Sequence, residues 1–100
     1  MSGDTEAFIV EKEMGITHAD FFRIIPRALG GKAYKKTSAK VTLNDGDKRL
    51  EITLGPERTR KIALMEIPAC DVRLEFSGYT DAEREAALDL FDLMFQKGGG

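Results

Sequence analysis

The first part of the chain shows a strand-like and then a helix-like pattern of apolar residues. Residues 7–12 form a short apolar run that ends in charges, which predicts a first strand. Thr17 and Asp20 have the spacing of a capping box, because the Thr17 oxygen can accept a hydrogen bond from a backbone N–H three residues on. Apolar residues then recur at helical spacing until Gly30, a typical helix end. We therefore expect one helix here, kinked or broken at Pro26.

A β-hairpin is expected directly after this helix. Apolar and polar side chains alternate toward the end of residues 34–43, as they do on a strand with one buried face. The sequence Asn-Asp-Gly-Asp at 44–47 has the composition of a tight hairpin turn. Leu50, Ile52 and Leu54 continue the alternation and predict the partner strand.

Two more strands complete the predicted sheet. Residues 55–58 have turn composition, and residues 59–67 are expected to form the next strand. Within this strand, the unbroken apolar run at 62–65 predicts burial on both faces or a bulge. A further turn is expected over residues 68–71. Regular alternation over residues 72–77 then predicts the last strand.

The final segment has the clearest helical pattern of the chain. Thr80 and Glu83 form a second capping box, and Asp81 adds a negative charge where the helix dipole favours one. One face of the predicted helix is apolar and the opposite face is polar. The residues expected on the buried face are Ala87, Leu90, Phe91, Met94 and Phe95. The residues expected to face solvent are Arg84, Glu85, Asp89, Asp92 and Gln96.

The predicted order of elements is strand, helix, four strands and helix. An antiparallel sheet with one polar face needs an apolar layer over the other face, and the two amphipathic helices can supply it. We therefore predict an α+β fold, a two-layer sandwich of a five-stranded, mostly antiparallel sheet with two helices on one face. A chain of 100 residues, 42% hydrophobic and 32% charged, suits one domain over residues 1–100. We expect residues 1–6 and 98–100 to be frayed.

The charged residues are segregated along the chain, although the net charge is only −2. Residues 21–44 carry six cations and no anion, whereas residues 1–20 and 81–96 each carry five carboxylates and one cation. Such a cationic run can bind an anion, a phosphate backbone or an acidic partner. It can equally be a solvated face that protects a strand edge. The cations are Arg23, Arg27, Lys32, Lys35, Lys36 and Lys40.

Residue types that carry catalysis or bind metals are sparse. His18 is the only histidine, so there is no second histidine with which to build a metal site. Cys70 is expected to be a half-buried, unreactive thiol in a turn, because the neighbouring Asp71 favours a raised thiol pKa. Gly30-Gly31-Lys32 ends a helix rather than opening one, which argues against a phosphate-binding loop. We predict no catalytic residue, no metal site and no cofactor.

Several features favour a cytoplasmic protein. A single cysteine cannot form an internal disulfide, and the first residues lack the basic and apolar segments of a secretory signal. No stretch reaches eighteen consecutive apolar residues, so we expect no membrane span. The pI near 5.4 argues against a general nucleic-acid-coating protein, which is usually basic. Nucleic-acid binding would depend on the local cationic run alone.

The main functional hypothesis is a small, non-enzymatic accessory or interaction domain. It would use a basic surface on the first helix and the following strand to bind an acidic protein partner or a second copy. One alternative is a ligand-binding or enzymatic subunit, with an anionic small molecule held in a cleft between the first helix and the sheet. Another is nucleic-acid binding through the same cations, with one aromatic residue for stacking. The residues assigned to this surface are Arg23, Arg27, Lys32, Tyr34, Lys35, Lys36 and Lys40.

Overall fold

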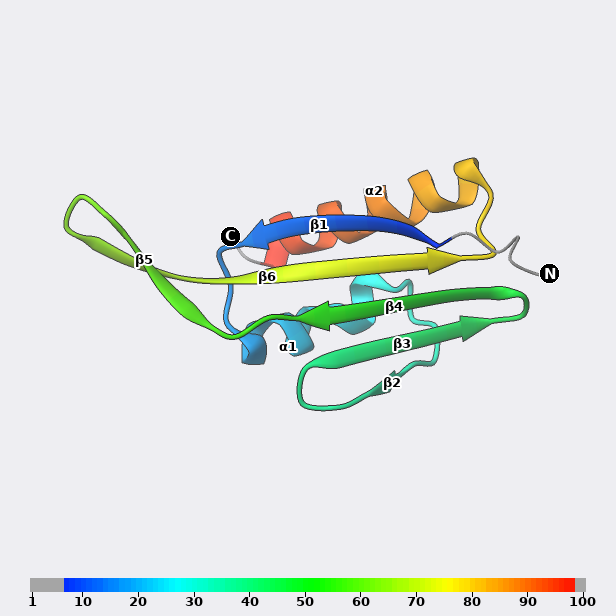
Figure 1. Ribbon diagram of the computed structural model, residues 1–100, viewed down its shortest axis with the longest axis horizontal. Helices are drawn as coiled ribbons and strands as arrows, with labels where there is room; N and C mark the ends of the chain where they lie inside the picture. Colours follow the sequence, from blue (N-terminus) through cyan, green and yellow to red (C-terminus); the bar gives the residue numbers. More distant parts are fainter. Residues whose placement is uncertain (1–6, 99–100) are drawn as a thin grey trace.

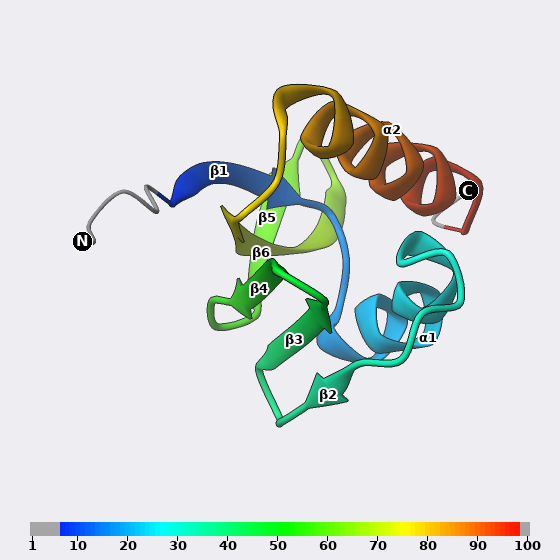
Figure 2. The same ribbon diagram turned by 90° about the vertical axis from the view of Figure 1, so that its right-hand side faces the viewer.

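Six antiparallel strands form one sheet, and both helices cover the same face of it (Figures 1 and 2). The computed structural model describes residues 7–98, so the segments 1–6 and 99–100 that we expected to be frayed lie outside it, while Gly98 ends the last helix. The predicted α+β sandwich is confirmed, with six strands rather than five. The elements are β1 (Phe8–Met14), α1 (His18–Ala28), β2 (Lys35–Lys36), β3 (Lys40–Asp45), β4 (Lys48–Leu54), β5 (Arg58–Ile62), β6 (Met65–Ser77) and α2 (Asp81–Gly98).

The strand order places the longest strand inside the sheet. The order is β1-β6-β4-β3-β2. The second part of β6 pairs with β1 on one side and with β4 on the other, so that Leu74 lies between Val10 and Ile52. The first part of β6, from Met65 to Ala69, pairs with β5. Every pairing is antiparallel, as the alternating pattern predicts.

The core lies between the inner face of the sheet and the two helices. Alternate residues of β3, β4 and the second part of β6 are buried on this face. The contact between the helices is built from aromatic rings: the Phe21 ring centroid lies 4.9 Å from that of Phe95 and 6.3 Å from that of Phe91. Full burial of one such side chain stabilises the fold by about 1.5–3 kcal/mol. These rings therefore fix the helices to each other.

The predicted caps are present at the start of both helices. Thr17 Oγ1 accepts a hydrogen bond from the Asp20 backbone N–H at 3.1 Å. Thr80 Oγ1 accepts from the Glu83 backbone N–H at 3.1 Å, and Glu83 Oε1 accepts from the Thr80 N–H at 2.9 Å. The bond from the Thr80 N–H lowers the pKa of Glu83. Pro26 lies in the last turn of α1 and does not break it, since the helix continues to Ala28.

The segment predicted as one strand over residues 59–67 is instead the end of a hairpin. The chain turns at Ala63 and Leu64, between β5 and β6, and the residues around this turn are exposed rather than buried on both faces. The turn predicted over residues 68–71 lies inside β6. Pro68 is tolerated in this strand because, among residues 7–98, only β5 pairs with that part of β6.

Three smaller predictions are also wrong. The strand predicted over residues 34–43 is interrupted, since β2 has only two residues and β3 starts at Lys40. Cys70 lies on the inner face of β6 and is fully buried rather than half-buried in a turn. Arg84 does not face solvent, because its guanidinium packs 3.7 Å from the ring centroid of Phe8.

Candidate interaction surface

A hairpin arm, residues 58–69, projects beyond the helices at one end of the molecule (Figure 1). The three residues Gly55, Pro56 and Glu57 lie opposite two residues of β6 at its base, which makes a β-bulge and redirects the strands. The described chain measures 52 Å along its longest axis and 26 Å and 25 Å across. Every residue from 58 to 66 is exposed. The arm is therefore a slender extension of two central strands.

The tip of the arm is apolar. Ile62 and Met65 face each other across the hairpin and are 50% and 62% exposed, and Leu64 in the turn is fully exposed. Ala63 has a φ of 56°, in the left-handed region that favours glycine. Apolar side chains gain free energy when they leave water, and these have no core to enter in their own chain. They are available to another molecule.

Ion pairs fix the base of the arm to the body. The Arg58 guanidinium contacts Glu13 of β1 and donates to Asp71 Oδ1 at 3.0 Å. Arg60 donates to the other oxygen of Glu13 at 2.7 Å. The hydrogen bonds to Asp71 and Glu13 raise the pKa of Arg58. Each exposed pair contributes little to stability, but pairs that share one carboxylate orient the arm relative to the sheet.

The start of α1 is anchored at the same place. The His18 backbone N–H donates to Glu57 Oε2 at 2.8 Å. The His18 Nε2 lies 2.7 Å from the Gly55 carbonyl oxygen, which can only accept a hydrogen bond, so Nε2 carries the proton. The single histidine therefore holds a helix end against the bulge. Its other ring nitrogen, Nδ1, lies 3.9 Å from Glu57 Oε2.

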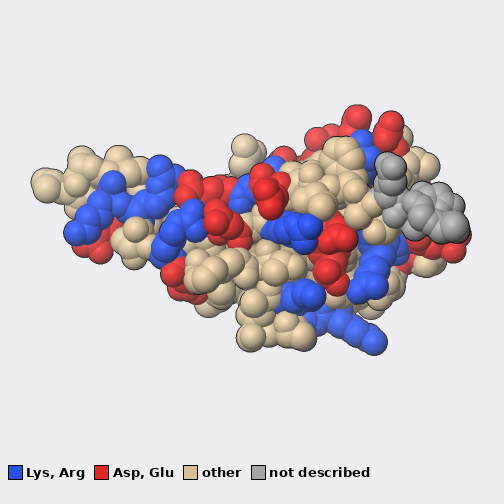
Figure 3. Space-filling view, in the orientation of Figure 1, with Lys and Arg blue, Asp and Glu red and all other residues tan. Residues whose placement is uncertain are grey.

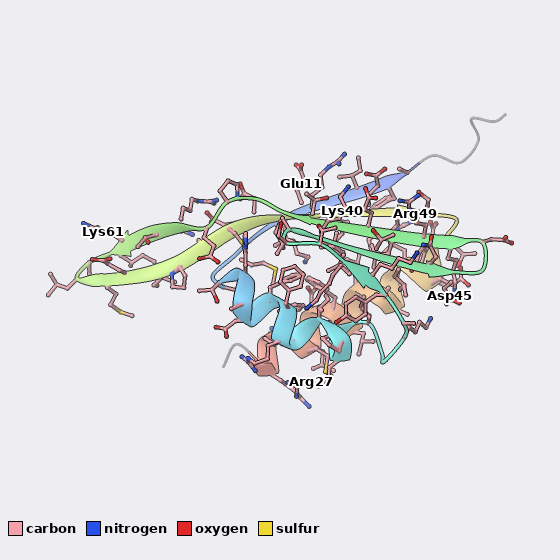
Figure 4. All side chains as sticks on the ribbon, turned by 90° about the horizontal axis from the view of Figure 1, so that it is seen from below. Glu11, Arg27, Lys40, Asp45, Arg49 and Lys61 are labelled. Carbon is pink, nitrogen blue, oxygen red and sulfur yellow. The ribbon has the colours of Figure 1, made fainter. Side chains whose placement is uncertain are left out.

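Cations lie along the length of the arm. Residues 58–69 include three cations and one anion, Glu66, which faces Lys61 across the hairpin. Basic atoms are prominent over the arm in the space-filling view (Figure 3). Arg58 and Arg60 share the face of Ile62, and Lys61 lies on the opposite face because side chains alternate along a strand. Lys61 is in the outer part of the arm (Figure 4). The sequence signal for this surface is a cationic segment that leads directly into an apolar run.

The residues predicted to form a basic surface are divided among different faces, and only three of them border α1. Arg23 and Arg27 are exposed on the helix, and Arg23 Nε lies 3.5 Å from an oxygen of Asp20. Lys36 reaches the same helix, with its Nζ 5.2 Å from the ring centroid of Phe22. These three are the part of the predicted set that the fold brings close together.

Two other predicted cations lie on the far side of the sheet. Lys35 pairs with Thr42 and shares the outer, solvent-facing side of the sheet with Lys40. Lys40 Nζ is 3.7 Å from Glu51 Oε1. Figure 4 shows Lys40 and Arg27 on opposite sides of the molecule. A single flat partner surface cannot contact both.

The last two members of the predicted set are held within the body. Lys32 Nζ donates to Asp45 Oδ2 at 2.8 Å, which raises the pKa of Lys32. Tyr34 is partly buried and packs against the core rather than standing out for stacking. The binding role assigned to these residues stays a prediction.

Other reactive groups of the described chain are occupied or dispersed. Cys70 is fully buried, and this burial raises the pKa of its thiol. Within residues 7–98, no group of three or more His, Cys, Asp or Glu side chains is placed to hold a metal ion. No helix in that range is both long and apolar enough to cross a membrane. Comparisons with protein-family models, with curated proteins and with solved structures gave no match to this chain, so a function has to be inferred from the geometry described above.

Proposed function

We propose that this chain is a cytoplasmic, non-enzymatic interaction domain that docks its arm into an apolar pocket of an acidic protein partner. The observation that carries the proposal is the exposure of Ile62, Leu64 and Met65 at the end of a projecting hairpin. Burial of one such side chain in a pocket is worth about 1.5–3 kcal/mol. A few anchors of this kind commonly supply most of the binding energy of an interface.

The cations of the arm support an acidic partner. Arg58 and Arg60 are partly neutralised by Glu13 at the base. Lys61, nearer the tip, forms no hydrogen bond or ion pair with any residue from 7 to 98. An acidic rim around the partner's pocket would complement Lys61 while the pocket takes up Leu64.

The cations that border α1 have a secondary part in this proposal. Arg27 and Lys36 lie on the body of the molecule, away from the tip. Exposed charges outside the contact mainly increase the association rate, and salt screens them over roughly 8 Å at physiological ionic strength. The double variant Arg27→Glu with Lys36→Glu should therefore slow association at low salt more than it speeds dissociation.

A photo-crosslinking amino acid at position 64 tests where the partner binds. The same group at position 47, in the exposed turn between β3 and β4, is the matched control. We expect position 64 to capture an acidic protein that position 47 does not, with the adduct identified by mass spectrometry. Equal labelling from the two positions contradicts the proposal.

Binding measurements with the purified partner then test the tip itself. Leu64→Asp should weaken binding by about 30-fold or more, as expected for a hot spot of about 2 kcal/mol. Leu93→Asp introduces the same change at a leucine of α2 that is 45% exposed, and it should leave binding unchanged. Equal effects of the two variants contradict docking through the arm. Sedimentation of the chain alone identifies a second copy as the partner if it dimerises and Leu64→Asp abolishes the dimer.

A further inference from the structure

A largely apolar cavity of about 270 Å³ is lined by residues of α1, α2 and the sheet. Figure 1 shows the end of α1, the start of α2 and the turn between β3 and β4 at the end of the molecule opposite the arm. The cavity lies between the end of α1, the first half of α2 and the inner face of the sheet, and opens to solvent. No residue of the arm lines it, so it is independent of the proposed docking function. Its apolar wall includes Leu29, Leu43, Leu50, Phe76, Leu90 and Phe91.

Two lysines at the mouth of this cavity converge on one carboxylate oxygen. Lys32 Nζ and Lys48 Nζ lie 2.8 Å and 3.8 Å from Asp45 Oδ2. Both lysines line the cavity, whereas Asp45 stands outside the lining at the end of β3 (Figure 4). Lys32 makes a charge-assisted hydrogen bond to this oxygen, while Lys48 lies beyond hydrogen-bond distance and adds its positive charge. The chain therefore fills this cationic position with a carboxylate of its own.

The other polar groups at the mouth are Tyr79, and Glu83, which accepts a hydrogen bond from Lys48. The Tyr79 ring packs edge-on against Phe76, with centroids 5.1 Å apart, and burial raises the pKa of Tyr79, so its hydroxyl is a neutral donor. Glu83 is committed to the cap of α2 and also lies 3.4 Å from Lys48 Nζ. When a ligand displaces Asp45, Lys32 loses its only carboxylate partner among residues 7–98, whereas Lys48 keeps Glu83.

We infer that the cavity binds a short-chain amphipathic carboxylate, whose hydrocarbon chain enters the apolar space and whose carboxylate replaces Asp45 between Lys32 and Lys48. The cavity volume is just below the range of about 300–1,000 Å³ typical of pockets for drug-sized ligands, which limits the ligand to a smaller molecule. A cationic head group would be repelled by the ammonium groups of Lys32 and Lys48. A neutral alcohol would lose the charge-assisted hydrogen bonds.

Calorimetric titration of the full chain with butanoate, hexanoate and octanoate tests the class of ligand. Affinity should rise about fourfold for each methylene that enters the cavity. Octan-1-ol should bind more weakly than octanoate, and octylammonium should not bind. Equal binding of octylammonium, or affinity that does not change with chain length, overturns the inference.

Two substitutions at the mouth should act in opposite directions. Asp45→Asn removes the internal competitor and should tighten octanoate binding about fivefold, while Lys32→Gln should weaken it about fivefold at low salt. Opposite signs at two side chains 2.8 Å apart are not expected from a general change in stability. Changes of the same sign, or no change in either variant, overturn the placement of the carboxylate.

A third variant tests the cavity itself. Ala87→Leu places a larger side chain in the cavity wall and should abolish octanoate binding. Ala82→Leu, on the exposed first turn of the same helix, is the control and should bind like the wild type. Unfolding midpoints report whether both variants fold. If Ala87→Leu does not fold, the Asp45→Asn and Lys32→Gln variants alone test whether octanoate binds in the cavity. Wild-type binding by a folded Ala87→Leu overturns the site, whereas Leu64→Asp should bind octanoate normally whether or not the arm docks a partner.

Discussion

The two parts of strand β6 lie in opposite environments. Residues 70–77 run between β1 and β4 beneath the helices, and Phe76 there is 2% exposed. Residues 65–69 pair with β5, and Met65 is 62% exposed. Both parts carry large apolar side chains, so apolar content by itself does not identify the core. The two parts of β6 differ in the layer that covers them, because the helices pack over residues 70–77 and do not reach residues 65–69.

The largest expected difference between the two parts is in their contribution to stability. Phe76→Ala removes a buried ring and should lower the free energy of unfolding by about 3–5 kcal/mol, a large share of the stability of a small domain. Met65→Ala should change it by less than about 0.5 kcal/mol, because the side chain is already exposed. Urea titrations of the two variants measure the difference. Similar losses in both would place the arm in the core.

A second prediction concerns Cys70, at the point where β6 enters the body. The sequence predicts a half-buried thiol at this position, but the residue is fully buried. A hydroxyl in this apolar interior should lower the free energy of unfolding by about 1–3 kcal/mol. The native thiol should also resist iodoacetamide until urea unfolds the chain, since burial raises its pKa. An unchanged urea midpoint together with rapid alkylation would mean that this position belongs to the exposed part of the strand.

A third, smaller effect is expected at the turn of the arm. Ala63 has a φ of 56°, which costs an alanine but not a glycine. Ala63→Gly should therefore raise the free energy of unfolding by about 1 kcal/mol. Ala33→Gly, at a loop residue without positive φ, is the control and should give no gain. If both variants lose stability, the turn is not held in the left-handed region in solution.

The smallest effect on stability is expected when the arm is shortened. Replacement of residues 61–66 by Asn-Gly joins Arg60 to Ile67, which face each other in the hairpin. The free energy of unfolding should change by less than about 1 kcal/mol, because the removed contacts are exposed. Partner binding should be lost and octanoate binding kept. Retained partner binding in this variant would move the docking surface from the arm to the body.

Features with a local cause could be predicted from the sequence. The caps at Thr17 and Thr80 depend on residues three positions apart, so their patterns are complete within one turn of chain. The hairpin at 44–47 has Gly46 at a φ of 64°, where glycine is favoured. Alternation over residues 72–77 identified a strand with one buried face, because that strand has a layer on one side only.

The arm could not be predicted, because burial does not have a local cause in the sequence. An apolar run signals burial, and burial depends on how far the helical layer extends, which is a property of the whole fold. The turn at Ala63 carries no glycine, so its position has no sequence signal of the usual kind. Pro68 suggested a turn, whereas the strand has an open edge at that point.

The charged surface was predicted only in part, because closeness in sequence is not closeness in space. Lys35 and Lys36 are adjacent, yet successive side chains of a strand point to opposite faces. One therefore lies on the outer face of the sheet and the other reaches Phe22 of α1. Lys32 is neutralised by Asp45, an interaction that appears only when the hairpin has folded back.

The pairing of β1 with β6 has a consequence for how the molecule is made. Phe8 faces Phe76, and Met14 faces Cys70. β1 is therefore synthesised before the other described strands, but its pairing partner β6 is synthesised after them. Until β6 leaves the ribosome, β1 has no neighbour and α1 has no complete sheet to cover. Closing so long a loop is slower than forming the local hairpins. We therefore expect the capture of β1 by β6 to be the slowest step of folding.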